Sequence, residues 1–189
     1  DAWRLKTGKL APEDTKAVIE AMGDLSEAPI YIDDTAGASI LEMRSKARKL
    51  KVAHDIDLII VDYLQLVDAG RKMDSREQQV SYVSQNLKNL ARELKVPVLA
   101  LSQLNRMVEQ RGSKRPQLAD LRESGSIEQD ADVVMFIYQE NENDDMLDSN
   151  KRMMKLNIAK HRNGSLGDID LMFRGDRVKF YGVEKSLQI

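Results

Sequence analysis

Residues 58–63 read Leu-Ile-Ile-Val-Asp-Tyr, and this stretch decides the fold class. Residues 56–61 are apolar except for Asp57, a pattern expected of a central parallel strand that is covered on both faces. The carboxylate of Asp62 follows directly at the end of this strand. In open α/β sheets, ligands gather beyond the carboxyl ends of the strands. The stretch therefore predicts an α/β protein with a candidate site at Asp62.

A helix and a second buried strand follow in the sequence. Ser75 and Gln78 have the spacing of a capping box at a helix start. An apolar stripe at helical spacing comes next, and we interpret it as core packing because the repeat is too short for a coiled coil. Its members are Val80, Val83, Leu87, Leu90 and Leu94. Residues 96–101 are again apolar, so the segment predicts a βαβ unit with a right-handed crossover.

The flanking regions predict further elements. Before the unit, we expect a helix from Pro12 that ends at Gly23, a brief strand at residues 30–32, and a helix capped by Ser39 and Glu42. After it, residues 132–138 predict a third apolar strand, and the polar residues 139–152 predict a surface loop. Alternating apolar residues then predict antiparallel strands around 154–158, 169–173 and 178–180.

The composition limits the class of protein. The 189 residues are 42% hydrophobic and 32% charged, which fits one domain over residues 1–189. A formal charge of -2 provides no global basic field, so any contact with DNA must be local. The absence of cysteine excludes a disulfide scaffold, and no signal-like or long apolar segment predicts export or membrane insertion. We expect a cytoplasmic protein.

Two strand-end residues are candidates for nucleotide chemistry. Asp62 at the first strand could hold a Mg²⁺ that bridges nucleotide phosphates. Gln103, after the neighbouring strand, could hydrogen-bond a γ-phosphate or its attacking water. The alternatives are that Asp62 caps the following loop and that the backbone satisfies Gln103. Asp62 and Gln103 each follow the carboxyl end of a strand of the same βαβ unit. Their occurrence together favours the nucleotide interpretation.

A pair of cations ends a later strand. Positions 154, 156 and 158 are apolar, so period-two alternation places Lys160 and Arg162 on the same, buried face. Two cations that point one way favour an anion as their ligand, although side chains that reach solvent at a sheet edge are the alternative. His161 and His54 are too isolated to indicate a metal site or a catalytic base.

Several segments together resemble the motor domain of DnaB-type replicative DNA helicases. The likeness rests on residues 61–66, 91–94, 96–104 and 120–132, with residues 5–10 and 30–35 in the same order. It covers essentially the whole chain. The resemblance implies a RecA-like P-loop NTPase core, with a mainly parallel sheet and antiparallel strands at its C-terminal end. It also implies a homohexameric ring that encircles single-stranded DNA and hydrolyses ATP with Mg²⁺ between subunits.

The resemblance also implies roles for particular residues. Asp62 would be the Walker B carboxylate that serves Mg²⁺, and Gln103 the γ-phosphate sensor. Lys160 and Arg162 would reach the γ-phosphate of the neighbouring subunit, with Arg162 acting as an arginine finger in trans.

The family's DNA-contact loop matches Arg122, Glu123 and Gly125. Arg122 could pair with phosphate, and Gly125 allows close backbone approach, so neither would read bases. The alternative is a helix start at this point, because Ser126 and Gln129 have capping-box spacing. A neighbouring cluster of Arg111, Lys114 and Arg115 could contact phosphate or could be a solvated charge cluster.

The chain carries no P-loop sequence. Thr7-Gly8-Lys9 is followed by Leu10 where a hydroxyl residue is required, and no Gly lies five residues before Gly8. The P-loop strand and helix are therefore missing, and we expect an inert fragment of a longer ATP-dependent helicase that binds primase and a helicase loader. The alternative is a non-catalytic module that retains subunit or single-stranded DNA contacts. A P-loop encoded upstream of Asp1 would favour the enzyme.

Overall fold

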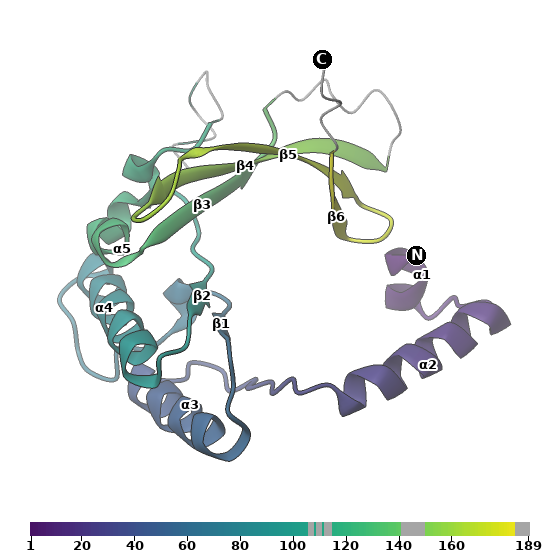
Figure 1. The fold of residues 1–189 in the computed structure, drawn as a ribbon, viewed down its shortest axis with the longest axis horizontal. Helices are drawn as coiled ribbons and strands as arrows, with labels where there is room; N and C mark the ends of the chain where they lie inside the picture. The colour runs from purple at the N-terminus through teal and green to yellow at the C-terminus, as the bar shows by residue number, and fades with distance from the viewer. Residues whose placement is uncertain (106–107, 109–110, 112–114, 141–149, 184–189) are drawn as a thin grey trace. The chain divides into compact units, whose positions relative to one another are not determined.

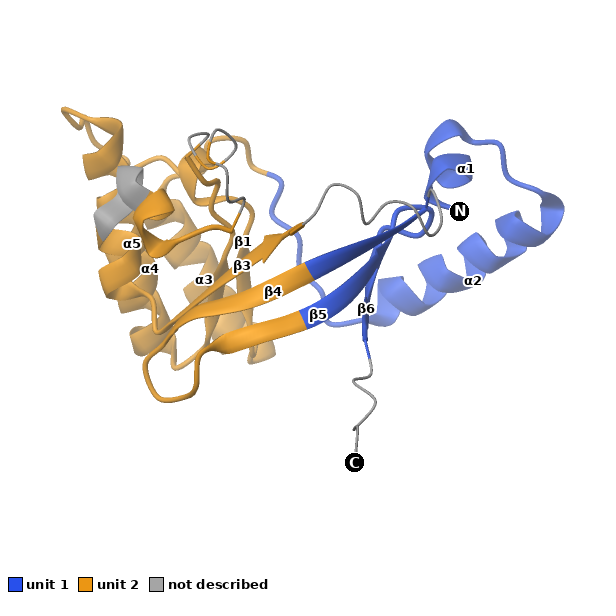
Figure 2. Cartoon of the chain, turned by 90° about the horizontal axis from the view of Figure 1, so that it is seen from above, with its two compact units in different colours: residues 1–34, 141–154, 170–189 blue, residues 35–140, 155–169 orange. Residues whose placement is uncertain are grey.

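The structure, a computed structural model, describes residues 1–105, 108, 111, 115–140 and 150–183, without the side chains of residues 122–125. It divides the chain into two units (Figure 2). Unit 1 comprises residues 1–34, 141–154 and 170–189, and unit 2 comprises residues 35–140 and 155–169. The expectation of one domain over residues 1–189 stays a prediction.

The core of unit 2 is built on α4 (Arg76–Leu94), which lies alongside β1 (Ile59–Val61) and β2 (Val98–Ala100) (Figure 1). The Ser75 side chain caps the helix by accepting from the Gln78 N–H over 3.2 Å. Val80, Val83 and Leu90 are almost completely buried, as the apolar stripe predicted. Burial of each such side chain contributes about 1.5–3 kcal/mol, so this stripe is the main attachment of the helix.

The predicted βαβ unit is confirmed. β1 (Ile59–Val61) and β2 (Val98–Ala100) flank α4 in sequence and pair in parallel. Both strands are shorter than the apolar runs that predicted them. Only one face is covered: Val61 packs in the core, whereas the side chain of Ile60 is 61% exposed. The expectation of a strand covered on both faces is therefore wrong for β1.

A second sheet has the strand order β3-β4-β5-β6. Its strands are β3 (Val133–Tyr138), β4 (Lys151–His161), β5 (Gly167–Arg174) and β6 (Lys179–Gly182). The pairs β3-β4 and β5-β6 are antiparallel, which confirms the predicted C-terminal strands. Among the described strands the parallel part is only β1-β2, smaller than expected, because residues 30–32 form no strand and β3 pairs with β4.

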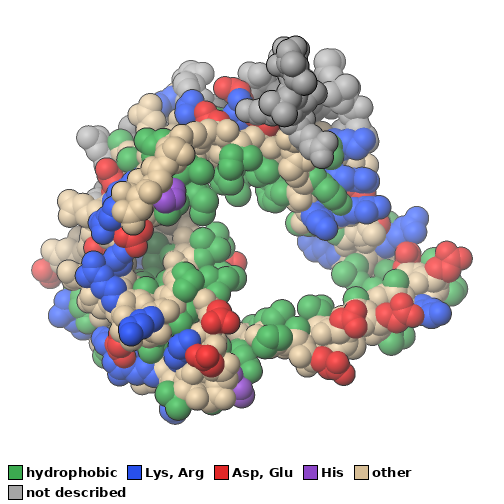
Figure 3. Space-filling model, in the orientation of Figure 1, with side chains coloured by type: hydrophobic (Ala, Val, Ile, Leu, Met, Phe, Trp, Pro, Cys, Tyr) green, Lys and Arg blue, Asp and Glu red, His purple; other side chains and the backbone are tan. Residues whose placement is uncertain are grey.

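β3 alternates between buried and exposed residues. Val134, Phe136 and Tyr138 are buried, whereas Met135 and Ile137 are about half exposed. Hydrophobic side chains are visible along the β3 and β4 region in Figure 3. β3 is therefore covered on one face, like β1.

Helix α3 (Ile40–His54) begins with the predicted capping box. The Ser39 N–H donates to the Glu42 carboxylate over 2.8 Å, and the Glu42 N–H donates to the Ser39 hydroxyl over 3.3 Å. Ile40 and Ala47 are buried. Among the described residues of unit 2, short helices also form at η1 (Leu64–Leu66), η3 (Leu118–Ser124) and α5 (Gly125–Asp130).

The N-terminal elements of the structure differ from the sequence-based picture in three ways. Helix α1 (Ala2–Thr7) was not predicted, and its Ala2 N–H donates to the Asp176 carbonyl over 2.8 Å. Helix α2 (Pro12–Glu27) continues past Gly23, because a glycine inside a helix costs only about 1 kcal/mol relative to alanine. Residues 30–32 form no strand, and the side chain of Ile32 is exposed.

The predicted surface loop at residues 139–152 falls mostly outside the described residues, which lack 141–149. At its end, Lys151 and Arg152 already belong to β4. Among the residues that the structure describes, no helix has the length and apolar character needed to cross a membrane.

Candidate functional site

The carboxyl ends of β1 and β2 lie at one edge of the parallel sheet. The register pairs Val61 with Ala100, and the Leu101 N–H donates to the Val61 carbonyl over 2.9 Å. Asp62 directly follows β1, and Gln103 follows shortly after β2. Both side chains are exposed. The structure therefore brings these two predicted site residues to the same edge.

The Asp62 carboxylate is available to an external ligand. Within the described ranges, no hydrogen bond or ion pair engages it, so the alternative of a loop cap has no supporting contact. The described residues also contain no group of three or more His, Cys, Asp or Glu that could hold a metal. Mg²⁺ at nucleotide sites takes one or two carboxylates and completes its shell with phosphate and water oxygens. Asp62 fits this single-carboxylate role.

Gln65 holds the backbone of Gln103. Its Nε2 donates to the Gln103 carbonyl over 3.3 Å and to the Ser102 hydroxyl over 3.1 Å. Its Oε1 accepts from the Gln103 N–H over 3.3 Å. In the described part of the chain, the side-chain amide of Gln103 makes no hydrogen bond. The backbone of Gln103 is thus fixed, and its amide remains free to meet a ligand.

Other contacts fix the turn that carries Gln65. The Leu64 N–H donates to the Leu101 carbonyl over 2.9 Å. From α4, the Arg76 guanidinium donates to the Gln65 carbonyl, and the Gln79 amide donates to the Val67 carbonyl over 3.2 Å. Sequence reasoning gave Gln65 no role. The only available signal was a second polar residue close behind Asp62 in an otherwise apolar turn.

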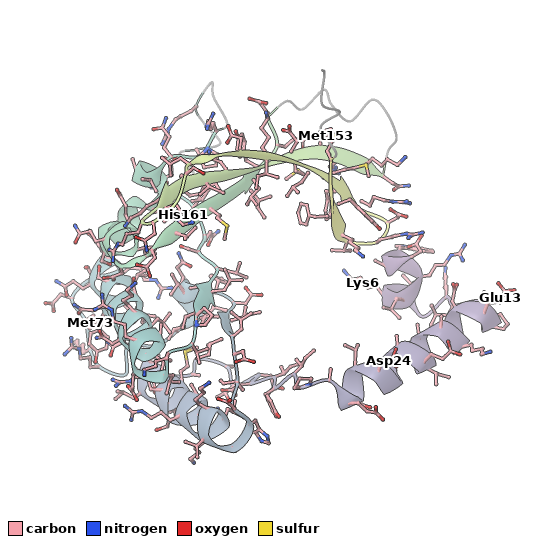
Figure 4. The ribbon with its side chains drawn as sticks, viewed as in Figure 1. Lys6, Glu13, Asp24, Met73, Met153 and His161 are labelled. Atoms are coloured by element: carbon pink, nitrogen blue, oxygen red, sulfur yellow. The ribbon has the colours of Figure 1, made fainter. Side chains whose placement is uncertain are left out.

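Lys160 and Arg162 both contact α5, on either side of His161, which is labelled in Figure 4. The Lys160 ammonium donates to the Glu128 carbonyl, and Arg162 Nη2 donates to the Gln129 carbonyl over 3.2 Å. The last carbonyls of a helix lack intrahelical partners and carry partial negative charge, so cations are favourable there. The two cations therefore do point to one element, as predicted.

The reason for this shared direction differs from the predicted one. The register pairs Ile158 with Met135 but Lys160 with Val134, and neighbours in β3 lie on opposite faces. The extra residue in β4, Ala159, produces this register shift. Lys160 therefore does not share a face with Ile158, and that expectation is wrong. None of the contacts of the two cations within the described residues reaches Asp62 or Gln103.

Asp132 is a carboxylate that joins Arg162 to a further cation, Lys88. Its carboxylate pairs with Lys88 of α4 and, over 3.1 Å, with Arg162 Nη1. The Arg162 N–H also donates to the Asp132 carbonyl over 2.8 Å. The hydrogen bond from Lys88 and the nearby positive charges of Arg162 and Arg92 hold the pKa of Asp132 below its ordinary value, against partial burial. Sequence reasoning included Asp132 in a motif without assigning it a role.

The predicted DNA-contact residues lie where η3 passes into α5. Arg122 and Glu123 belong to η3, and Gly125 is the first residue of α5; their side chains lie outside the description. The alternative of a helix start at this point is confirmed, since α5 begins at Gly125. The capping box offered for it is wrong, because Ser126 lies inside α5 and its buried hydroxyl has no hydrogen-bond partner among the described residues.

The neighbouring basic residues are held within unit 2. Arg111 pairs with Asp120, whose side chain is only 1% exposed and also accepts from the Gln117 N–H over 2.7 Å. Arg115 pairs with Asp168 over 3.0 Å. Lys114 lies outside the described residues. Contact of this cluster with phosphate stays a prediction.

The fold and the strand-end site define a class of protein. A βαβ unit that presents a carboxylate and an amide at one edge, followed by antiparallel strands, is typical of RecA-like ATPase domains. Residues 1–182 match the family model described as the DnaB-like helicase C terminal domain. This chain belongs to that family.

Individual relatives agree with the family. The chain is 50% identical to the replicative DNA helicase DnaB of Geobacillus stearothermophilus and 49% identical to the replicative DNA helicase DnaC of Bacillus subtilis. Each match covers 98% of this chain and 41% of the relative. This chain thus spans less than half the length of these relatives.

Solved structures of related proteins have the same fold as this chain. One is of a DnaB-like replicative helicase and its interactions with primase, with a TM-score of 0.86, 40% identity, and coverage of 97% of this chain and 45% of the other. A second, of an ATPase domain, has a TM-score of 0.85 at 40% identity and covers 97% of this chain and 66% of the other. The RecA-like class inferred from the sequence is confirmed.

Proposed function

We propose that this chain is the part of a replicative helicase motor that senses the nucleotide, contacts DNA and completes the site of a neighbouring subunit. The full gene product would hydrolyse ATP and couple hydrolysis to translocation on single-stranded DNA and to duplex unwinding. It would act as a homohexameric ring in the cytoplasm. The observation that carries the proposal is the placement of Asp62 and Gln103 at one sheet edge, each with a free polar group.

The two strand-end residues, Asp62 and Gln103, would contact different parts of the bound nucleotide. Asp62 would hold Mg²⁺, directly or through water, and Mg²⁺ would neutralise charge on the phosphates. The Gln103 amide would hydrogen-bond the γ-phosphate or the attacking water. Loss of the γ-phosphate removes the partner of this amide, so Gln103 can report hydrolysis to β2 and to Gln65.

Lys160 and Arg162 would act on the ATP of the adjacent subunit. A guanidinium presents several N–H groups in a planar fork that matches phosphate oxygens, and its charge stabilises the transferring phosphoryl group. Primase and a helicase loader would bind through the longer protein.

DNA would be held through its phosphates. Arg122 would pair with a phosphate, and Gly125, at the start of α5, would offer a main-chain N–H, with Glu123 in the same loop. Such contacts position a strand without reading its sequence. The binding should therefore be general for single-stranded DNA and sensitive to salt.

The test is ATP turnover by the full gene product, with and without single-stranded DNA. Asp62→Asn should reduce Mg²⁺-dependent turnover by about a hundredfold or more, because it removes the charge that holds the metal. Asp57→Asn is the matched control, since Asp57 is an exposed carboxylate before the same strand and should leave turnover unchanged. A wild-type protein that binds single-stranded DNA but never hydrolyses ATP would instead establish a non-catalytic module.

A further inference from the structure

The ion pairs around Asp132 join three elements of unit 2. Asp132 stands between α5 and β3, Lys88 lies on α4, and Arg162 follows β4. Arg162 Nη1 lies 3.1 Å from one carboxylate oxygen, and the Lys88 ammonium pairs with the other. Both side chains of the Asp132–Arg162 pair remain about half exposed, at 54% and 48%. The pair is therefore accessible to a competing anion.

The contacts of Arg162 leave it only partly available to phosphate. Its Nη1 is used by Asp132, and its Nη2 donates to the Gln129 carbonyl. A carboxylate and a phosphate compete for the same face of a guanidinium, because both accept its parallel N–H groups. Lys160 is engaged in the same way by the Glu128 carbonyl. The cations must exchange these partners before they can hold a phosphate.

The element that holds the cations is the one that begins at the predicted DNA contact. α5 starts at Gly125 and ends at Asp130, so it is about 9 Å long at 1.5 Å per residue. Its last turn supplies the carbonyls of Glu128 and Gln129 to Lys160 and Arg162. A shift or rotation at the start of so short a helix must also move these carbonyls.

We infer that Asp132 is a positioning residue for Arg162. It holds the guanidinium against α5 and competes with phosphate for it. Contact of DNA with the start of α5 weakens this ion pair and releases Arg162. This inference rests on the proposed function. Asp132 would thereby keep ATP turnover low when no DNA strand is bound. DNA binding would then be coupled to the movement of the Arg162 side chain from Asp132 to the γ-phosphate in the neighbouring subunit.

The experiment compares ATP turnover of the full gene product with and without a single-stranded oligonucleotide. Asp132→Asn keeps the size and an acceptor oxygen but removes the charge. It should raise DNA-independent turnover about two- to fivefold, the range expected for a half-exposed ion pair, and lower the stimulation by DNA accordingly. Asp132→Glu, which keeps the charge, should restore the wild-type ratio.

A neighbouring carboxylate provides the matched control. Asp130 is the last residue of α5 and accepts from the Ser84 hydroxyl over 2.7 Å, without contacting either cation. Asp130→Asn should leave the DNA stimulation ratio unchanged.

The outcomes separate this inference from the proposed function. An unchanged stimulation ratio in Asp132→Asn, or an equal fall of both rates, overturns the role of Asp132 while wild-type turnover upholds the motor. Wild-type protein without ATP turnover overturns both. If Asp132→Asn does not give folded protein by thermal unfolding, Asp132→Ser carries the same expectation and the same overturning result.

Discussion

Gln65 and Gln103 are joined by two hydrogen bonds that run in opposite directions. The Gln65 amide donates to the Gln103 carbonyl, and its oxygen accepts from the Gln103 N–H, each over 3.3 Å. One side chain thereby occupies both backbone groups of the proposed sensor residue. The turn after Asp62 and the end of β2 are consequently coupled, so a shift at Gln103 is transmitted to the strand that carries the carboxylate.

Gln65→Leu should impair hydrolysis more than nucleotide binding. The change removes both hydrogen bonds and leaves backbone groups of Gln103 without these partners, at about 1–2 kcal/mol or more. We expect kcat for ATP to fall roughly tenfold, the equivalent of about 1.4 kcal/mol, with little change in KM. Steady-state kinetics of the full gene product would measure this.

Gln79→Leu is the matched control for this prediction. The Gln79 amide supports the same turn through the Val67 carbonyl over 3.2 Å but makes no contact with Gln103. It should lower the free energy of unfolding without the selective loss of kcat. Equal losses in both variants would show that Gln65 only stabilises the turn.

The elements that were predicted correctly are those specified by nearby residues. Ser39 and Ser75 both start helices, because the side chain and the backbone N–H that it caps lie three residues apart. The missing strand at residues 30–32 depended on a distant partner, whereas the continuation of α2 past Gly23 was a local misjudgement of the cost of a helical glycine. Residues 30–32 have the composition of a strand, but a strand exists only beside another one, and a single sequence does not say which residues lie there.

In the candidate site, too, the residues that a local pattern marks were predicted, and those that depend on distant contacts were not. Asp62 and Gln103 followed from the ends of two apolar runs, whereas the partner of Gln65 lies 38 residues away and leaves no local pattern. The face of Lys160 was predicted wrongly because an extra residue in β4 interrupts the alternation. Asp132 meets cations from two other elements, which hydrophobic periodicity does not record.

A finger that acts in trans predicts complementation between two inactive variants. Arg162→Ala should nearly abolish ATP hydrolysis and leave nucleotide binding largely intact, because it removes charge that is needed at the transferring phosphoryl group. Asp62→Asn should be inactive through loss of the Mg²⁺ ligand. When the two variants are mixed before assembly, some interfaces combine an intact Asp62 with an intact Arg162. ATP turnover of the mixture should therefore exceed that of either variant.

The same mixture distinguishes cis from trans action. If Arg162 acted on the nucleotide of its own subunit, every site in the mixture would lack one of the two groups, and turnover would stay at the background level. Each variant assembled alone, at the same total protein concentration as the mixture, is the control for effects of assembly on turnover.

The ion pairs of Glu93 predict a pH-dependent part of the stability. The hydrogen bonds from Arg48 and then Arg44 of α3 lower the pKa of Glu93 from 4.5 to about 2. A carboxylate with a depressed pKa stabilises the folded state above the unfolded-state value, and this stabilisation is lost as the pH falls towards the folded-state value. Glu93→Gln should therefore lower the free energy of unfolding at pH 7 by a constant amount down to about pH 4.5.

Below that pH, the difference between wild type and Glu93→Gln should shrink and disappear near pH 2. Denaturant titrations of both proteins at a series of pH values would record it. A difference that persists unchanged at the lowest pH would assign the effect to packing or to neutral hydrogen bonds instead of to charge.

Arg122→Ala should weaken binding of single-stranded DNA equally for all sequences, since the proposed contact is to a phosphate. One lost phosphate contact should reduce the slope of log binding constant against log salt concentration by about 0.7, the value per charge for single strands. Lys49→Ala is the control, because it removes one exposed positive charge from α3 and should leave the slope unaltered. Fluorescence anisotropy with oligonucleotides of different sequence, over a range of salt, would measure both quantities. A loss of affinity confined to particular sequences would mean that Arg122 contacts bases. An equal change of the salt slope in Lys49→Ala would mean that the effect comes from the net charge of the protein and not from a contact of Arg122.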